Sequence, residues 1–182
     1  MSNGAALLVI DVQEAFNDPS WGLRNNPQCE SNIARLQQYW REKDGVVLHV
    51  QHVSDDVDSL FYRDSPGGVA FQPWTQPLPD EPVFEKMTDT AFIHTGLHRY
   101  LIDNDLHRLV VVGFTTPHGI SSTVRLGAEL GFNITVVEDA TAAFSLTDWN
   151  GICYNAEQVH QFALAEMFQT FADVRTTKEL TR

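Results

Sequence analysis

The 182-residue sequence is poor in cysteine, in basic residues and in long apolar runs, and each shortage excludes a class of protein. Its two cysteines, Cys29 and Cys153, are too few and too far apart for a disulfide framework or a CxxC metal site, so we expect ordinary thiols in a reducing compartment. The amino terminus has no basic segment, and its apolar run over residues 5–10 is followed at once by Asp11. No signal peptide or membrane span is therefore predicted, and we expect a cytoplasmic protein without a membrane partner.

The shortage of positive charge limits the partners that the protein can bind. The 12 lysines and arginines stand against 24 aspartates and glutamates, which gives a formal net charge of −12. Because such a chain has no basic surface for a phosphate backbone, we expect no nucleic-acid partner. Apolar residues, in contrast, make up 43% of the chain. At this length they can bury a substantial core, and we expect a single domain over residues 1–182.

Short runs rich in β-branched residues alternate with segments of helical spacing. The runs cover residues 5–11, 45–53, 106–114, 132–140 and 171–177. Their nearly continuous hydrophobicity is typical of strands that are buried on both faces. The alternation predicts an α/β fold, a three-layer doubly wound domain with a central, mostly parallel sheet flanked by helices. Gly45 and Gly131 stand where a left-handed glycine would end a helix.

The segment of residues 54–82 interrupts this alternation. It contains most of the chain's eight prolines and shows no sustained period. A loop of this length in a compact domain is usually functional or disordered, and its aromatic residues favour an ordered cover. These residues are Phe61, Tyr62, Phe71 and Trp74. We therefore expect the loop to flank the functional site.

Three residues stand at strand ends of the predicted sheet, where an open α/β sheet binds its ligand. Asp11 ends the first apolar run, Lys86 ends the short apolar stretch PVFEK, and Gly119 opens the helix after the third run. Taken alone, an aspartate in such a position is more often a cap, and a lysine is more often a surface charge. The combination of the three positions indicates a functional site far more specifically than any one of the residues does alone.

The stretches LLVIDVQEAF, EKMTDTAF and VVVGFTTPHGISSTVR follow one another along the chain. With them the sequence resembles the isochorismatase-like, or cysteine hydrolase, superfamily, which includes nicotinamidases and N-carbamoylsarcosine amidohydrolases. The catalytic triad of that superfamily is Asp, Lys and Cys. The resemblance implies that Asp11 and Lys86 match the first two and that Gly119 stands at the position of the nucleophilic cysteine. It also implies a non-proline cis peptide at Phe114–Thr115 and an oxyanion hole formed by the amides of Thr115 and Gly119.

A glycine cannot do the work of the cysteine. In the usual triad the helix dipole and the lysine favour the thiolate, while the aspartate takes the thiol proton and returns it to the leaving amine. Three interpretations stay open. The chain is an amidase-type framework whose nucleophile is replaced, and thus inactive as an amidase, or an isochorismatase-type vinyl-ether hydrolase, or a non-catalytic small-molecule binding protein. In the second interpretation Asp11 is the acid, and burial would have to raise its pKa.

Position and resemblance together predict the remainder of the pocket. We expect an aromatic wall suited to a small planar substrate. The residues assigned to the pocket are Phe16, Trp21, Trp74, Phe92 and His118. The resemblance further implies a homo-oligomer, a dimer or a tetramer.

The histidines do not form the pattern of a metal site. His49 and His52 are three residues apart on a predicted strand and should face opposite sides of the sheet. The carboxylates of the following SDDVDSLF lack the Asp-x-His spacing of metal-binding relatives. We therefore expect no metal and no cofactor, with His49 in the core and His52 hydrogen-bonded within the loop.

Overall fold

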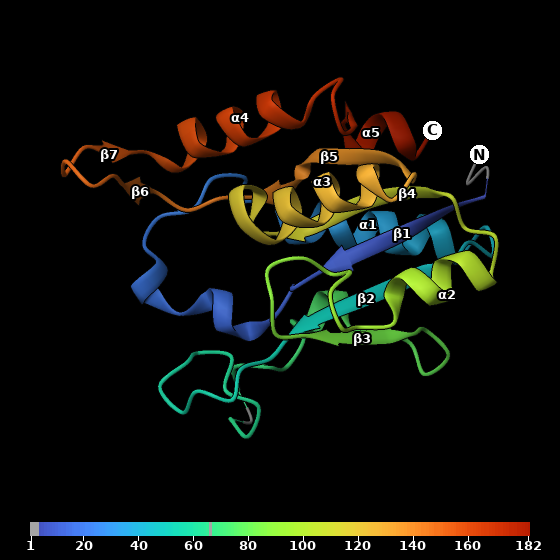
Figure 1. Ribbon diagram of the computed structural model, residues 1–182, viewed down its shortest axis with the longest axis horizontal. Helices are drawn as coiled ribbons and strands as arrows, with labels where there is room; N and C mark the ends of the chain where they lie inside the picture. The colour runs from blue at the N-terminus through green and yellow to red at the C-terminus, as the bar shows by residue number, and fades with distance from the viewer. Residues whose placement is uncertain (1–3, 66) are drawn as a thin grey trace.

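A sheet of six strands forms the centre of the molecule in a computed structural model, which describes residues 4–65 and 67–182 (Figure 1). The strands are β1 (Ala5–Ile10), β2 (Val47–His52), β3 (Val83–Lys86), β4 (Arg108–Phe114), β5 (Asn133–Ala142) and β8 (Asp173–Arg175). They lie in the order β3-β2-β1-β4-β5-β8, and neighbouring strands run parallel. The predicted doubly wound α/β fold is confirmed.

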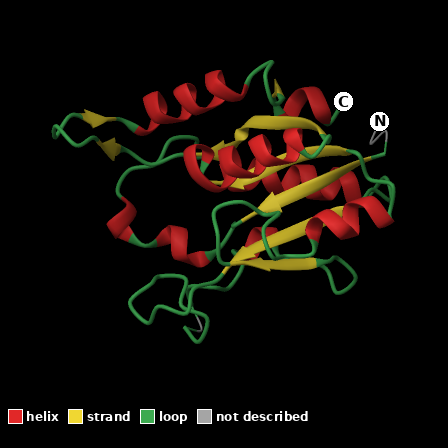
Figure 2. Cartoon of the chain, in the orientation of Figure 1, coloured by secondary structure: helices red, strands yellow, loops and turns green. Residues whose placement is uncertain are grey.

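Helices cover both faces of the sheet (Figure 2). They are α1 (Cys29–Arg41), α2 (Leu97–Asp103), α3 (Ser121–Glu129), α4 (Ala156–Met167) and α5 (Thr177–Leu180). Strand side chains alternate between the faces, so Leu7 and Val9 join the buried cluster under α1, whereas Leu8 and Ile10 join the cluster under α2, α3 and α4. Burial on both faces explains why the strand sequences are continuously apolar. None of the helices in the described part of the chain is long and apolar enough to cross a membrane.

Short elements connect the main ones. They are η1 (Glu14–Asn17), η2 (Pro19–Trp21), η3 (Pro73–Thr75), η4 (Thr116–Ile120), β6 (Leu146–Thr147) and β7 (Cys153–Tyr154). Strands β6 and β7 form an antiparallel ribbon that extends away from the main sheet (Figure 1). The η4 turn joins β4 directly to α3 and is the strand–turn–helix corner that contains Gly119.

Two local features differ from the sequence prediction. Strand β3 is not predicted as a strand, because it has only four residues and three of them are partly or fully exposed at the sheet edge. Gly131 takes the predicted left-handed conformation with a φ of 93°, but after α1 the left-handed residue is Asp44, with a φ of 51°. The prediction for Gly45 is therefore wrong. A glycine is needed there because a Cβ would lie 2.8 Å from Cδ1 of Trp40.

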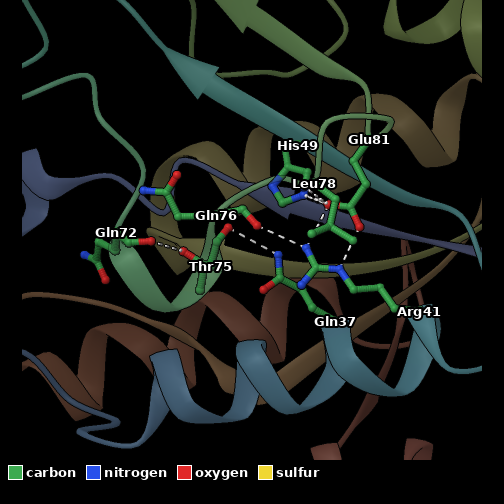
Figure 3. Close-up of polar contacts among 8 residues, drawn as sticks. All are labelled: Gln37, Arg41, His49, Gln72, Thr75, Gln76, Leu78 and Glu81. Atoms are coloured by element: carbon green, nitrogen blue, oxygen red, sulfur yellow. Dashed lines mark hydrogen bonds and ion pairs between the residues drawn. The ribbon is translucent and has the colours of Figure 1, made fainter.

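A polar network ties α1 to the chain that leads into β3 (Figure 3). Glu81 accepts hydrogen bonds from Nε and Nη2 of Arg41 at 2.7 and 2.8 Å, and from the N–H of Leu78 at 2.9 Å. The Nε2 of His49, a core residue as predicted, lies 2.8 Å from the same carboxylate. Burial alone would raise the pKa of Glu81, but these hydrogen bonds outweigh it and lower the pKa to about 2. The network thus fixes where β3 begins and, three residues later, where Lys86 lies.

We expect Glu81→Gln to destabilise the fold at neutral pH. The folded pKa of Glu81, about 2, lies below the ordinary value of 4.5, so the carboxylate adds stability above pH 4.5 that is lost as the pH falls toward 2. Urea denaturation should show that the free energy of unfolding falls by about 2–4 kcal/mol at about pH 7. The difference should shrink at about pH 3. Glu129→Gln, at an exposed position at the end of α3, is the matched control and should change little. An equal loss at both pH values would contradict this role.

Candidate active site

The carboxyl ends of β1, β2, β3 and β4 meet at one edge of the sheet and line a cavity of about 290 Å³. The cavity is lined by Asp11, Phe16, Trp21, His52, Phe61, Lys86, Asp89, Thr115, His118 and Gly119. Asp11 directly follows β1, Lys86 ends β3, and Thr115 directly follows β4. Parallel strands therefore bring together residues that are far apart in the sequence, as the strand-end argument predicts.

Asp11 and Lys86 form a buried ion pair. Nζ of Lys86 lies 2.7 Å from Oδ2 of Asp11, and the side chains are only 2% and 6% exposed, respectively. The ammonium also donates a hydrogen bond of 3.1 Å to the carbonyl oxygen of Thr88 and lies 3.3 Å from Nδ1 of His52. A lysine ammonium has three N–H bonds, and these three partners use all of them when Nδ1 of His52 carries no proton. Lys86 therefore has no donor left for a substrate.

Asp11 has a raised pKa, a left-handed backbone and a carboxylate oxygen without a hydrogen-bond donor among the described residues. Burial raises its pKa to about 6, although the charge and the hydrogen bond of Lys86 act in the opposite direction. The backbone has a φ of 54°, in the left-handed region that few residues other than glycine adopt. No described residue donates a hydrogen bond to the buried Oδ1. Asp11 thus changes its protonation near neutral pH and keeps one acceptor atom without a partner.

His52 lies beside Lys86 in the cavity, so the prediction that it hydrogen-bonds within the loop is wrong. Burial and the charge of Lys86 lower its pKa to about 4. The ring is therefore neutral at physiological pH, and Nδ1 can accept a hydrogen bond from the ammonium. The sequence puts His52 on a strand, as the structure does, but it gives no sign that Lys86, at the end of the neighbouring strand, is its partner.

Gln13 is a positioning residue that the sequence analysis missed. It is fully buried, and its side chain exchanges two hydrogen bonds with the backbone of His52, of 2.9 and 2.7 Å. The same Nε2 donates to the carbonyl oxygen of Val69 at 3.1 Å, which attaches the loop of residues 54–82 to the end of β2. A glutamine two residues after Asp11, in an otherwise buried apolar stretch, is the signal that could have identified it.

One part of the backbone that the resemblance implies is present at the corner after β4. The Phe114–Thr115 peptide bond is cis, as predicted. Oγ1 of Thr115 lies 3.0 Å from Nδ1 of His118, and both residues line the cavity. A Cβ on Gly119 would lie 3.1 Å from Oδ2 of Asp11 and 3.1 Å from the carbonyl oxygen of Phe114. A side chain at residue 119 would therefore point at the carboxylate, which is how a nucleophile lies relative to its base.

Aromatic rings form one wall of the cavity. The ring centroid of Phe16 lies 5.0 Å from that of Trp21 and 5.1 Å from that of Phe61. Nε1 of Trp21 donates a 2.9 Å hydrogen bond to the carbonyl oxygen of Ala15, which fixes the indole. Phe61 belongs to the loop of residues 54–82, so this part of the loop is the ordered flank that the sequence predicts.

Two residues predicted to line the pocket lie elsewhere. Trp74 is 74% exposed on η3, where it borders a separate hollow of about 670 Å³ beside α1. Phe92 stacks on Phe132 in the core, with ring centroids 5.6 Å apart. Gly127 makes room for Phe92, because a Cβ there would lie 2.9 Å from its ring. Both predictions are wrong because packing within η3 and under α3, and not the distance along the chain, decides where these rings point.

Within the described residues, no group of three or more His, Cys, Asp or Glu side chains is arranged to hold a metal ion. The titratable groups of the cavity itself are Asp11, His52, Lys86, Asp89 and His118. The ammonium of Lys86 occupies the centre of this group, because it contacts both Asp11 and His52. The arrangement is therefore suited to proton transfer and to hydrogen bonding at the carboxylate of Asp11.

Known proteins are similar to this chain in both sequence and fold. The family model described as Isochorismatase domain matches residues 5–179. The uncharacterized isochorismatase family protein YrdC of Bacillus subtilis is 39% identical over 180 residues, which cover 99% of this chain and 96% of that protein. A solved structure of an isochorismatase-family protein from Chromobacterium violaceum has a TM-score of 0.94 at 38% identity, and covers 97% of this chain and 91% of its own. An isochorismatase structure from Pseudomonas putida has a TM-score of 0.90 at 33% identity, with 98% and 90% covered.

We expect Lys86→Met to destabilise the protein in a pH-dependent way. The variant leaves a buried carboxylate without its cation, so the loss in free energy of unfolding should be about 3–5 kcal/mol at about pH 8. The folded pKa of Asp11 is already raised from 3.8 to about 6, and without Lys86 it should rise further. A raised carboxyl pKa removes stability as the pH increases, so the loss should be smaller at about pH 5. Urea denaturation at both pH values measures the loss in free energy of unfolding.

The double variant Asp11→Asn with Lys86→Met is the control for this prediction. It buries neither charge, and asparagine tolerates the left-handed backbone at residue 11. It should therefore recover most of the stability that Lys86→Met alone loses. A loss that does not depend on pH, or a double variant as unstable as the single one, would show that the ion pair is not the source of the effect.

Proposed function

The chain belongs to the isochorismatase family, and we propose that it carries the framework of an amidase-type cysteine hydrolase in which Gly119 takes the place of the nucleophile. In this proposal the cavity binds a small molecule and does not hydrolyse amides through a covalent intermediate. One observation carries the proposal. A side chain at residue 119 would begin 3.1 Å from the carboxylate of Asp11, and glycine supplies none.

The thiols of this chain support the proposal. Covalent amide hydrolysis in this framework needs a thiolate that can reach the substrate. Of the two cysteines, Cys29 is buried in α1 and Cys153 is exposed in β7, and neither lines the cavity. Burial raises the pKa of the Cys29 thiol well above its ordinary range, which keeps it protonated. Neither thiol can therefore replace the missing nucleophile.

Binding relies on parts of the site that do not need the nucleophile. The backbone N–H groups of Thr115 and Gly119 would receive a carbonyl oxygen, in the manner of an oxyanion hole. The rings of Phe16, Trp21 and Phe61 would hold a small planar group by stacking and apolar contact. A non-catalytic binding protein would bind its ligand with the same groups. That interpretation differs from this proposal only in having no catalytic activity at all.

The raised pKa of Asp11 favours a second candidate, an isochorismatase-type vinyl-ether hydrolase. In that reaction a carboxylic acid protonates the enol-ether carbon, and water captures the resulting oxocarbenium ion, so no nucleophilic side chain is needed. With a pKa of about 6, Asp11 is partly protonated near neutral pH. However, isochorismate carries two carboxylates, whereas Lys86 has no free donor and Asp89 adds negative charge to the cavity. This candidate therefore ranks second.

Gly119→Cys is expected to create a reactive thiol. Its Cβ would need to shift by only a few tenths of an ångström to relieve the contacts of 3.1 Å, and Asp11 would then accept the thiol proton. We expect iodoacetamide to alkylate residue 119 at least about tenfold faster than the exposed Cys153, which serves as an internal control. Mass spectrometry of the peptides measures both rates in one sample.

The reactivity of this thiol should depend on the ion pair. Adding Asp11→Asn or Lys86→Met to Gly119→Cys should remove most of the acceleration, with circular dichroism as the check that the variants fold. The unmodified chain should release no ammonia from small amides such as nicotinamide. Ammonia release by the unmodified chain that Asp11→Asn abolishes would contradict the proposal.

Isochorismate separates the two candidates. We expect the unmodified chain to release no pyruvate from it between about pH 5 and pH 9, a range that covers an ordinary and a strongly raised aspartate pKa. A vinyl-ether hydrolase would instead lose activity as the pH rises through about 6, because Asp11 must carry a proton to act as the acid. Asp11→Asn would abolish that activity, and Gly119→Cys would not increase it. Pyruvate release with this profile would replace the first proposal by the second.

A further inference from the structure

The backbone hydrogen bonds of the η4 turn are shared and irregular. The N–H groups of His118 and Ile120 both donate to one carbonyl oxygen, that of Thr115, at 3.1 and 3.2 Å. The N–H of Ser121 is likewise shared between the carbonyl oxygens of Thr116 and His118. A turn of this π type is rare and frequently lies at a functional site. Shared bonds leave the geometry of the turn dependent on contacts with other elements.

Thr116 supplies such a contact with α4. Its side chain is fully buried, whereas its neighbours Thr115, His118 and Gly119 line the cavity. Oγ1 of Thr116 lies 2.8 Å from Nδ1 of His160, a residue of α4 that is only 2% exposed. Among the described residues, this is the one side-chain hydrogen bond that joins η4 to another element.

The neighbours of His160 determine which of its ring nitrogens carries the proton. Nε2 lies 3.4 Å from Nδ2 of Asn26. That amide already donates both of its N–H bonds, to the carbonyl oxygens of Glu138 and Thr141 at 2.7 Å each. Burial lowers the pKa of His160, although a hydrogen bond with the backbone of Glu138 acts in the opposite direction. The neutral ring therefore carries its proton on Nε2, and Nδ1 accepts the hydrogen bond from Thr116.

The anchor of His160 is an irregular part of the sheet. Residues 137–140 of β5 bulge out where the pairing with β4 shifts its register. The hydrogen bonds of Asn26 to Glu138 and Thr141 span this bulge and hold it in one shape. A bulge beside a site commonly redirects the chain or a side chain toward it. The sheet thus sets the position of the His160 ring, and the ring sets the position of the turn.

A polar pair at this place does more than fill space. Two apolar side chains could pack here without burying any polar atom, and they would avoid the cost of desolvation. A buried hydrogen bond, in contrast, fixes a direction as well as a distance, and it specifies one arrangement of the groups that it joins. The bond between Thr116 and His160 is therefore suited to holding the turn in a single orientation.

We propose that His160 is a positioning residue for the cavity, although it does not line it. By accepting a hydrogen bond from Thr116, it holds the η4 turn in the one geometry in which the N–H groups of Thr115 and Gly119 face a ligand. A Cβ at residue 119 would lie 3.1 Å from Oδ2 of Asp11, so a small rotation of the turn would change this approach as well. The inference rests on the binding role proposed above and adds a residue outside the cavity that this role requires.

Hydrogen exchange, followed by NMR on the full chain, tests the inference without any ligand. Thr116→Val keeps the shape of the side chain and removes the hydroxyl. The N–H groups of His118 and Ile120 should exchange at least about tenfold faster in this variant, because the turn opens more often. Thr116→Ser retains the hydroxyl and should stay within about threefold of the unmodified chain. The N–H of Leu8, in the central strand β1, should keep its rate in both variants.

Two outcomes of this experiment would overturn the inference. Equal acceleration at Leu8 and at the turn would show that Thr116→Val lowers only the global stability. Unchanged exchange at His118 and Ile120 would show that the bond to His160 does not hold the turn.

Gly119→Cys provides a second readout at the site itself. Adding Thr116→Val should slow the alkylation of residue 119 by iodoacetamide at least about tenfold, since a small displacement of a reacting group is costly. Thr116→Ser should keep most of the rate. His160→Leu should act like Thr116→Val, and the two together should slow alkylation no more than either one alone, because both break the same bond. Thr170→Val, at an exposed position, is the matched control and should change nothing.

The two readouts separate this inference from the proposed function. Alkylation of residue 119 that Thr116→Val leaves unchanged, despite faster exchange in the turn, would overturn the positioning role of His160. A thiol at residue 119 with no enhanced reactivity in any variant would refute the proposed function. The exchange rates of the turn would still decide the inference in that case, so the two failures are distinguishable.

Discussion

A buried ion pair between Lys86 and Asp11 determines the chemistry of the whole site. Removing both charges from water costs several kcal/mol, so the pair is stable only if its geometry is good and the remaining N–H bonds find acceptors. The carbonyl oxygen of Thr88 and the imidazole of His52 supply those acceptors. The same contacts occupy the ammonium fully and so exclude it from binding a ligand anion. Because burial outweighs the attraction of Lys86, the carboxyl group keeps a pKa of about 6.

The rest of the structure places the two partners within 2.7 Å of each other. Lys86 ends a strand of four residues at the sheet edge, and such a strand has few contacts of its own to define its position. The network around Glu81 anchors the start of this strand to α1, while Gln13 anchors the end of β2 and the long loop next to it. Residues outside the ion pair are thus needed for its geometry, which is why we expect substitutions at Glu81 to act through stability.

The sequence predicts five of the six strands of the sheet, because long apolar runs are local features, and it identifies Asp11, Lys86 and Gly119 as candidate site residues. It does not predict β3, which is short and partly exposed, or the place of Gly45, where a contact with Trp40 and not the turn requires glycine. Trp74 and Phe92 were misplaced because the direction of a side chain near a loop depends on packing with distant residues. The partners of buried polar side chains lie far away in the sequence, so the roles of such residues became clear only in three dimensions.

The titration of the Asp11 carboxyl group tests the central claim most directly. It can be followed by ¹³C NMR on the full chain, with Asp11→Asn used to assign the resonance. We predict a midpoint near pH 6. In Lys86→Met the midpoint should move upward, because the ammonium favours the ionised carboxylate. A midpoint near the ordinary value of 3.8 that does not change when Lys86 is replaced would contradict the account.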